Sequence, residues 1–326
     1  MQKNIVILSY GNEIEYRRSI FCVLSFFAWS VENKHTILIY TDNPEFFKLY
    51  LHQPNISYYL LTPELLTDML GEDKFLHRIK VSVVRLTFQN FPHRDLLFLD
   101  SDTFFVGSSS KVFKLFKKGV SLMHKMEYTL GDSLRIFSDY KQSEFPEAFL
   151  KYISSHEFII NSKTEKFTAE DYSWNSGVLG LTEDFAIYKD DILKLTDEFY
   201  ANSKWFISEQ LAFSLILQRK TQIKRTDHVI VHYWNKVQKT LIDDLLMTLF
   251  TVQNDMLNSL TFIRFLTRKY KKDIEIDLIL KEACSAFVSK NYYYGIKKAI
   301  QISFKSPSSL FKLWNLYRIG KSLNIK

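Results

Sequence analysis

Short apolar runs alternate with amphipathic segments over the first part of the chain. The apolar runs predict strands at residues 5–8, 36–40 and 56–61. Between them, apolar positions recur with helical spacing, as in the segment 16–27. Strands that alternate with helices in this order indicate a mostly parallel, twisted sheet flanked by helices. We therefore expect an α/β fold.

The run Leu-Leu-Phe-Leu at residues 96–99 is apolar throughout and ends abruptly at Asp100, Ser101 and Asp102. An uninterrupted run of this kind is typical of a strand buried inside an α/β sheet. The two carboxylates then lie at its carboxyl end, where ligands bind in such sheets. Two acidic groups this close favour a hard divalent cation, Mg²⁺ or Mn²⁺. The alternative is a turn, since Asp and Ser side chains also bond to nearby backbone.

Beyond the acidic pair the pattern predicts strands at residues 104–106 and 120–124 and a helix at 183–200. The segment 125–171 mixes aromatic, charged and serine residues without a steady period, apart from a helix near 144–153. Long irregular segments inside a regular domain are usually functional loops. We expect this one to shape a binding pocket.

From residue 241 onward the strands stop, and helices are predicted at residues 241–257, 260–270, 274–288 and 292–303. We therefore expect two parts, a first domain of residues 1–240 and a basic helical region of residues 241–326. Between Arg264 and Lys326, fourteen Lys or Arg residues stand against four acids. This balance, 14 − 4 = +10, exceeds the +7 of the whole chain.

Aromatic residues interleave with these C-terminal charges. Such segments fit adsorption of residues 264–326 to an anionic membrane surface, to which each Lys or Arg adds about 1 kcal/mol. The alternative is a helical cap whose basic face is solvated. No nucleic acid is expected as a partner, because no recognition motif accompanies the charge.

Length and composition narrow the class further. With 326 residues and 46% hydrophobic content, the chain can bury one large core and a smaller appended unit. Cys22 and Cys284 are its two cysteines, which indicates free thiols in a reducing compartment. The first apolar run is too short for a signal peptide, and the longest, residues 20–29, is too short to cross a bilayer. We expect a cytoplasmic protein, with peripheral contact to the inner membrane face left open.

Two motifs resemble a known family. Asp100-Ser101-Asp102 after a buried strand resembles the DxD motif of nucleotide-sugar glycosyltransferases with the GT-A fold, which holds a metal against the donor diphosphate. Asn175-Ser176-Gly177-Val178 resembles the Asn-Ser/Ala-Gly-Val segment of glycosyltransferase family eight, the group of glycogenin and lipopolysaccharide galactosyltransferases. Order and spacing match over about the first 240 residues. The resemblance implies a GT-A fold and a glycosyltransferase.

The family also implies a third metal ligand. His232 ends the last predicted strand, residues 228–234, where family members carry a metal-binding histidine. The resemblance thus assigns Asp100, Asp102 and His232 to one ion, and imidazole favours Mn²⁺ over Mg²⁺. Taken alone, a single histidine is more often a hydrogen-bonded structural residue. His228 lies too far along the strand to share the metal.

Residues for the donor follow from the resemblance and from position. Lys80, on the helix before the acidic strand, matches a basic residue that in the family points at the donor phosphates, and Arg85 is the reserve candidate. The alternative is that these charges form the solvated face of the helix, as most helix charges do. In place of the family's His-x-x-Gly-x-x-Lys the chain lacks the Gly and carries Lys236 two residues early. The expected donor-binding set is Ser9, Tyr10, Asn12 and Asp42 at the first two strand ends for the nucleoside, with Lys80, Ser101, Asn175, Gly177 and Lys236.

Catalysis is expected at Glu209 and Gln210, which align with a family Asp-Gln-Asp whose third position is Leu211 here. Glu209 could be the general base of an inverting transferase. In retaining family members an amide lies near the anomeric carbon, as Gln210 would. Without the resemblance, Glu209 would be an ordinary acidic residue in the first turn of a helix, and Gly177 an ordinary glycine at the start of a strand. By analogy we favour retention.

Together these residues predict a metal-dependent transfer of sugar from a nucleotide-diphosphate sugar, a UDP-sugar by expectation. The acceptor would be a glycan or lipid-linked glycan in surface polysaccharide or lipopolysaccharide synthesis, with residues 125–171 shaping its pocket. One rival is a haloacid-dehalogenase-like phosphatase using Asp100 and Asp102, weakened by Phe104 at the motif's fifth position. The other is a non-catalytic protein that binds membrane surfaces.

Overall fold

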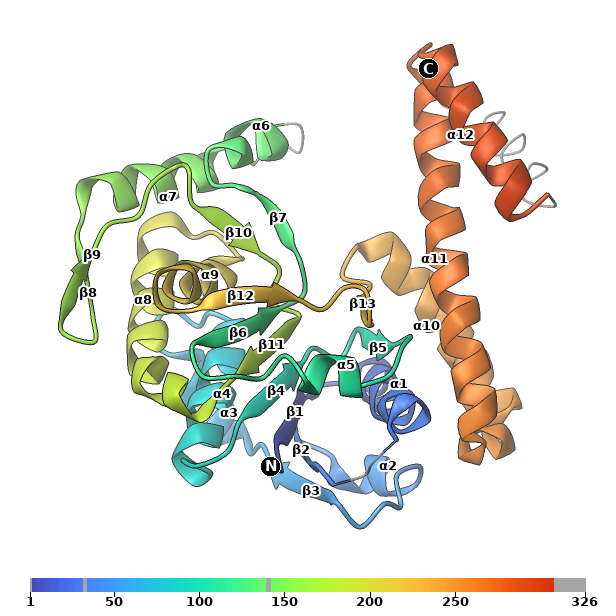
Figure 1. Cartoon of the computed structure of the whole chain (residues 1–326), viewed down its shortest axis with the longest axis horizontal. Coiled ribbons are helices and arrows are strands. Elements are labelled where there is room, and N and C mark those ends of the chain that lie inside the picture. Colours follow the sequence, from blue (N-terminus) through green and yellow to red (C-terminus); the bar gives the residue numbers. More distant parts are fainter. Residues whose placement is uncertain (1, 32–33, 139–141, 308–326) are drawn as a thin grey trace.

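The computed structural model describes residues 2–31, 34–138 and 142–307. A seven-stranded sheet lies at its centre (Figure 1). Its strands are, in spatial order, β12 (Gln222–Arg225), β6 (Val120–Met123), β11 (Val178–Leu181), β4 (Leu96–Leu99), β1 (Asn4–Leu8), β2 (Thr36–Thr41) and β3 (Ile56–Leu60). Only β11 runs antiparallel to its neighbours among these described strands. The predicted α/β class with a mostly parallel sheet is confirmed.

Three antiparallel pairs of short strands stand outside this sheet: β5 (Thr103–Phe105) with β13 (Ile230–His232), β7 (Met126–Thr129) with β10 (Tyr172–Trp174), and β8 (Phe158–Ile160) with β9 (Lys163–Glu165). The helices before residue 236 are α1 (Glu13–Trp29), α2 (Pro44–Lys48), α3 (Pro63–Leu70), α4 (Arg78–Asn90), α5 (Ser110–Phe113), α6 (Asp132–Ser138), α7 (Glu144–Ser155), η1 (Glu183–Tyr188), α8 (Lys189–Ser203) and α9 (Ser208–Lys220). The later helices are α10 (Lys236–Val252), η2 (Asn254–Asn258), α11 (Leu260–Val288) and α12 (Tyr292–Lys305).

Both faces of the central sheet are covered by helices, which explains why its middle strands β1 and β4 are continuous apolar runs. In β4, Leu97 and Leu99 join a cluster with side chains of α1, α10 and α11. Leu96 and Phe98, which point the opposite way, join a cluster with α4, α8 and α9. Burial of one such side chain contributes about 1.5–3 kcal/mol. The acidic motif therefore begins at the end of a rigid central strand.

Several sequence expectations need correction. The segment 125–171 is more regular than expected, since it contains β7, α6, α7, β8 and β9. The last strand, β13, begins at Ile230, so His228 lies in the preceding turn and not on the strand. The helices expected at 260–270 and 274–288 are one helix, α11, because the charged residues between them include no helix breaker.

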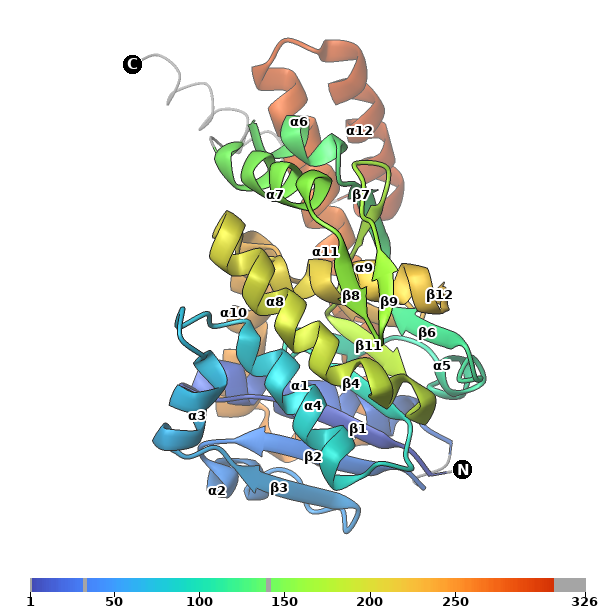
Figure 2. The ribbon, with the colours of Figure 1, turned by 90° about the vertical axis from the view of Figure 1, so that its left-hand side faces the viewer.

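The C-terminal helices pack directly on the first domain. Side chains of α10 and of the first half of α11, such as Ile242 and Ile263, belong to the same core as α1. Arg18 of α1 donates two hydrogen bonds to Asp243, at 2.6 and 2.7 Å. The boundary expected at residue 240 falls inside α10. The far half of α11 and α12 share a smaller cluster around Ala283 and Ile302, and extend away from the sheet (Figures 1 and 2).

Within the described ranges, no helix combines the length and the apolar character that a bilayer-spanning segment requires. Cys22 and Cys284 are both free, as expected, and Cys22 is buried. The basic tail, residues 308–326, lies outside the described part of the chain.

Candidate functional site

Asp100, Asp102 and His232 converge at the carboxyl end of β4. The pairing of β13 with β5 sets His232 opposite Thr103, directly beside the acidic motif. His232 Nε2 lies 3.2 Å from Asp102 Oδ1 and 3.9 Å from Asp100 Oδ2. One ligand atom from each of the three residues lies within 4.8 Å of the other two. The three residues that the sequence assigned to one ion therefore meet in space.

Hydrogen bonding fixes which imidazole nitrogen of His232 is free. His232 Nδ1 lies 2.6 Å from Asn175 Oδ1, and this oxygen also accepts the Gly177 N–H at 3.1 Å. Nδ1 must therefore carry a proton, so Nε2, which faces the two carboxylates, is the ring nitrogen that could bind a metal ion. Metal-binding histidines have this arrangement, with the distal ring nitrogen held by an outer acceptor.

Gly177 is required by the same ring. A Cβ atom at position 177 would overlap the His232 imidazole. The Gly177 carbonyl also accepts the backbone N–H of Asp100 at 2.9 Å, so the backbone cannot withdraw without disturbing the acidic motif. The glycine of the Asn-Ser-Gly segment is thus a close-approach position for His232, and its expected contact with the donor stays a prediction.

A lysine ammonium neutralises each carboxylate of the motif. Lys80 Nζ lies 3.1 Å from Asp100 Oδ2, and Lys239 Nζ lies 2.8 Å from Asp102 Oδ2. Burial lowers the pKa of Lys80, but Asp100 and Glu209 outweigh it and raise the pKa above its usual value. Burial raises the pKa of Asp102, yet His232 and Lys239 bring it well below its ordinary range. The site therefore holds an ionised Asp102 carboxylate beside the ammonium groups of Lys80 and Lys239.

Glu209 and Gln210, in the first turn of α9, form the wall next to Lys80. Glu209 Oε1 accepts from Ser176 Oγ at 2.9 Å and lies 3.4 Å from Lys80 Nζ, while Oε2 accepts the Gln210 N–H. Gln210 Oε1 accepts the Ser176 N–H at 3.2 Å. Because both Glu209 oxygens are engaged inside the protein, the arrangement disfavours Glu209 as a general base.

The expected nucleoside residues lie at the ends of β1 and β2, which are neighbours of β4 in the sheet. Asn12 caps α1 by accepting two backbone N–H groups, at 3.0 and 3.2 Å. Asp42 accepts from Gly11 N at 2.9 Å and from Tyr16 Oη at 2.7 Å. These two side chains hold the turn in shape. The buried Ser9 hydroxyl has no hydrogen-bond partner among the described residues, and burial raises the pKa of Tyr10 to about 12.

Three further candidates for donor binding have the following surroundings. Ser101 Oγ donates to Glu15 Oε2 at 2.6 Å, so α1 holds the middle residue of the motif. Arg85 pairs with Asp190 at 2.6 Å, and its reserve role as a phosphate ligand stays a prediction. Lys236 is exposed at the first position of α10, and no hydrogen bond or ion pair in the described chain joins its side chain to the acidic motif. Its phosphate role stays a prediction.

The sequence analysis missed three residues at this site. Lys239 lies almost one helical turn after Lys236, a spacing that would have indicated it. Glu127, in β7, accepts from two side-chain amides of the site, yet no motif marks it. His124 stacks edge-on behind His232, with ring centroids 5.5 Å apart. Burial and the nearby His232 lower the pKa of His124 to about 3, so this ring is neutral.

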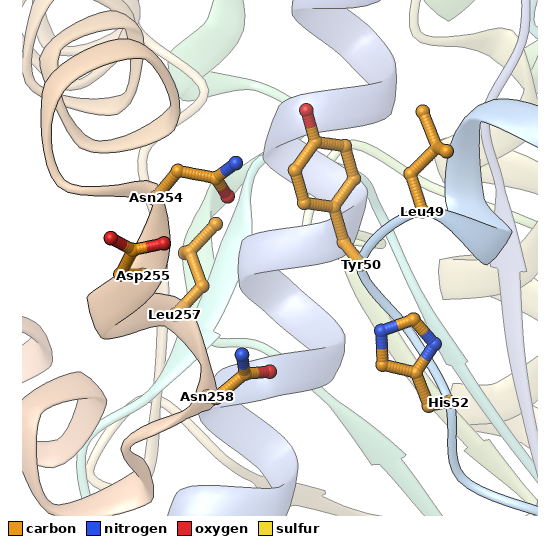
Figure 3. A pocket seen from close by; sticks show the side chains of 7 residues that line it. All are labelled: Leu49, Tyr50, His52, Asn254, Asp255, Leu257 and Asn258. Carbon is orange, nitrogen blue, oxygen red and sulfur yellow. The ribbon is translucent and has the colours of Figure 1, made fainter.

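A small pocket lies apart from the acidic motif, between the segment after α2 and η2 (Figure 3). None of the residues proposed from sequence lines it. Its lining residues are Leu49, Tyr50, His52, Asn254, Asp255, Leu257 and Asn258. The carboxyl edge of the sheet is therefore where the chemically capable side chains meet.

Comparison with known proteins finds likeness in structure but not in sequence. No protein-family model and no curated protein matches the chain. Among solved structures, the galactosyltransferase LgtC bound to donor and acceptor sugar analogues is 13% identical, covers 78% of this chain and 98% of its own, and has a TM-score of 0.47. Mouse xyloside xylosyltransferase 1 in its apo form is 10% identical, covers 69% of this chain and 85% of its own, and has a TM-score of 0.44.

The bifunctional glycosyltransferase WbbM is also similar, at 11% identity and a TM-score of 0.44. The match covers 68% of this chain but 38% of WbbM, so the chain corresponds to less than half of that protein. At such identities and TM-scores these likenesses assign no activity to this chain. Its function has to be inferred from its own side chains.

Proposed function

We propose that this chain is a metal-dependent glycosyltransferase that takes a sugar from a UDP-sugar and passes it to a glycan or lipid-linked glycan. The observation that carries the proposal is the convergence of Asp100, Asp102 and His232 Nε2. Two carboxylate oxygens and one imidazole nitrogen suit Mn²⁺, and Mg²⁺ less well. The same proposal places the enzyme in surface polysaccharide or lipopolysaccharide synthesis.

The two lysines support a diphosphate leaving group. A bound divalent ion would supply Lewis-acid stabilisation of the charge that develops on that group. The ammonium groups of Lys80 and Lys239 lie on either side of the carboxylates and carry no covalent role. A bound cation would balance the charge of the two carboxylates in place of the lysines. The ammonium groups of Lys80 and Lys239 could then bind phosphate oxygens of the donor, as lysines commonly do.

The remaining roles follow the sequence expectations and extend this proposal. Ser9, Tyr10, Asn12 and Asp42 would receive the nucleoside at the neighbouring strand ends. Gln210 would lie near the anomeric carbon, which favours retention, and the internal contacts of Glu209 agree with the lack of a general base.

Loss of the divalent ion is expected to stop turnover. Wild-type protein with Mn²⁺ should release UDP from its UDP-sugar, EDTA should reduce the rate to background, and excess Mn²⁺ should restore it. The reason is that the leaving diphosphate then lacks its stabilising charge. UDP release that continues unchanged in EDTA would contradict metal dependence. Phosphate release from p-nitrophenyl phosphate that disappears in Asp100→Asn would instead favour the phosphatase alternative.

We further propose peripheral attachment to an anionic membrane on the cytoplasmic side, through residues 264–326. On α12, four large side chains on one helical face are exposed: Tyr293 (82%), Ile296 (53%), Ile300 (53%) and Phe304 (86%). After Glu282 the sequence has no acid and eight Lys or Arg residues. Both views place α12 at the same end of the molecule as α6 and α7 (Figures 1 and 2). Helices α6 and α7 belong to residues 125–171, the segment that is expected to face the acceptor.

Flotation with lipid vesicles tests this attachment. The full chain is expected to float with phosphatidylglycerol vesicles and not with phosphatidylcholine vesicles. Ile300→Ser/Phe304→Ser should lower the bound fraction at least tenfold, because each buried apolar side chain is worth about 1.5–3 kcal/mol. Sugar transfer to a soluble acceptor should not change. Ile159→Ser, at an exposed position of β8, is the matched control, and equal flotation of all variants would refute the attachment.

A further inference from the structure

Glu127 bridges two carboxamides of the candidate site. Its Oε1 accepts from Asn175 Nδ2 at 3.1 Å, and its Oε2 accepts from Gln210 Nε2 at 3.1 Å. Asn175 follows β10, Gln210 lies in α9, and Glu127 lies in β7, which pairs with β10. One carboxylate therefore joins three elements of the fold at the edge of the site.

This bridge fixes the orientation of both amides. Because a carboxylate only accepts, each amide must turn its nitrogen toward Glu127 and its oxygen away. The Asn175 oxygen then faces the Gly177 N–H and His232 Nδ1, and the Gln210 oxygen faces the Ser176 N–H. The orientation of Asn175 in turn requires a proton on His232 Nδ1, which makes Nε2 the ring nitrogen available to a metal ion.

We propose that Glu127 is a positioning residue that selects the metal-binding tautomer of His232 through Asn175. The inference rests on the proposed metal-dependent function and adds a residue that touches no candidate metal ligand in the described structure. Outer carboxylates of this kind commonly orient a metal-binding histidine directly. Here the orienting charge acts across an intervening amide, so the amide and the carboxylate must be matched.

Glu127→Gln is expected to lower the affinity of the metal-free protein for Mn²⁺ by about 10–100-fold. A glutamine offers one acceptor to two amide donors, so one of the two amides must turn over. Gln210 is the better held, because its Nε2 also donates to Ser173 Oγ at 2.9 Å. Asn175 therefore turns, its nitrogen faces His232, and the proton moves to Nε2. Free Mn²⁺, measured by electron paramagnetic resonance without donor, gives the affinity.

Asn175→Asp is expected to lose Mn²⁺ affinity too, because two carboxylates then face each other at positions 127 and 175. The double variant Glu127→Gln/Asn175→Asp should regain affinity to within a few fold of the wild type. In it the new glutamine donates to the aspartate and accepts from Gln210, while the aspartate accepts from His232 Nδ1. Every hydrogen bond of the wild-type network is thereby satisfied again.

Recovery in the double variant separates positioning from a general structural role, which would make the two losses add. Glu170→Gln, at an exposed carboxylate, is the charge-matched control and should bind Mn²⁺ as the wild type does. Unchanged affinity in Glu127→Gln, or additive losses in the double variant, would overturn the inference. If one single variant fails to fold, two measurements still decide the inference. The first is the Mn²⁺ affinity of the double variant, and the second is the effect of adding Glu127→Gln to Asn175→Ala, which should not change the affinity further. Failure of the wild type to bind Mn²⁺ would instead refute the proposed function.

Discussion

Asp102→Asn is expected to reduce UDP release by about a thousandfold while leaving the fold intact. The substitution keeps the shape of a buried side chain and removes its charge. It takes one anionic ligand from the site and leaves Lys239, 2.8 Å away, without its carboxylate. Loss of an electrostatic contribution of about 4 kcal/mol to the transition state corresponds to that factor, at 1.36 kcal/mol per tenfold change.

Initial rates of UDP release and Mn²⁺ affinity, measured on the same preparation, test this expectation. Both should fall together, because the carboxylate acts through the ion. The melting temperature provides the control for folding, and Asp132→Asn, in the first turn of α6, removes an equal charge away from the acidic motif. Turnover that persists in Asp102→Asn would exclude the site described here as the place of the reaction.

Gly177→Ala is expected to lower Mn²⁺ affinity by at least a hundredfold and to destabilise the protein by about 1–3 kcal/mol. The added Cβ would overlap the His232 ring, and the bond from Asp100 N–H to the Gly177 carbonyl holds position 177, directly before strand β11, in place. The imidazole must therefore leave its place beside the carboxylates. Metal titration and thermal unfolding measure the two effects separately.

The chain offers a matched control for this variant. A Cβ at Gly180, three residues later in strand β11, would overlap the side chain of Leu122 in the core and not the His232 ring. Gly180→Ala should therefore destabilise the protein by a similar amount and leave Mn²⁺ affinity unchanged. Adding His232→Ala to Gly177→Ala should restore stability without restoring the metal. Normal Mn²⁺ affinity in Gly177→Ala would mean that the ring contact has no bearing on the site.

The sequence identified the parts of the site that lie next to regular elements. The run at residues 96–99 marks a buried strand by its apolar side chains alone, so the position of Asp100 and Asp102 at its end could be predicted. His232 could be predicted only through the family resemblance, because its approach to the acidic motif depends on the antiparallel pairing of β13 with β5. Such a pairing has no signal in local periodicity.

The residues that the sequence analysis missed depend on longer-range contacts. Glu127 reaches the site from β7, where no motif distinguishes it from a solvated charge. Lys239 reaches the site from α10, where its helical spacing from Lys236 is the one signal that could have indicated it. The single helix α11 was divided wrongly because a charged segment, Lys271 to Asp273, interrupts its apolar pattern while helical backbone continues through it. Charge patterning reports the exposed face of a helix and not its end.

Pulsed electron paramagnetic resonance of Mn²⁺ added to the metal-free protein tests the central claim most directly. We expect electron-spin-echo modulation from one directly bound imidazole nitrogen, and its disappearance in His232→Gln. This result would place His232 Nε2 on the ion together with the two carboxylates. A spectrum without nitrogen modulation, or one that His232→Gln leaves unchanged, would contradict the account.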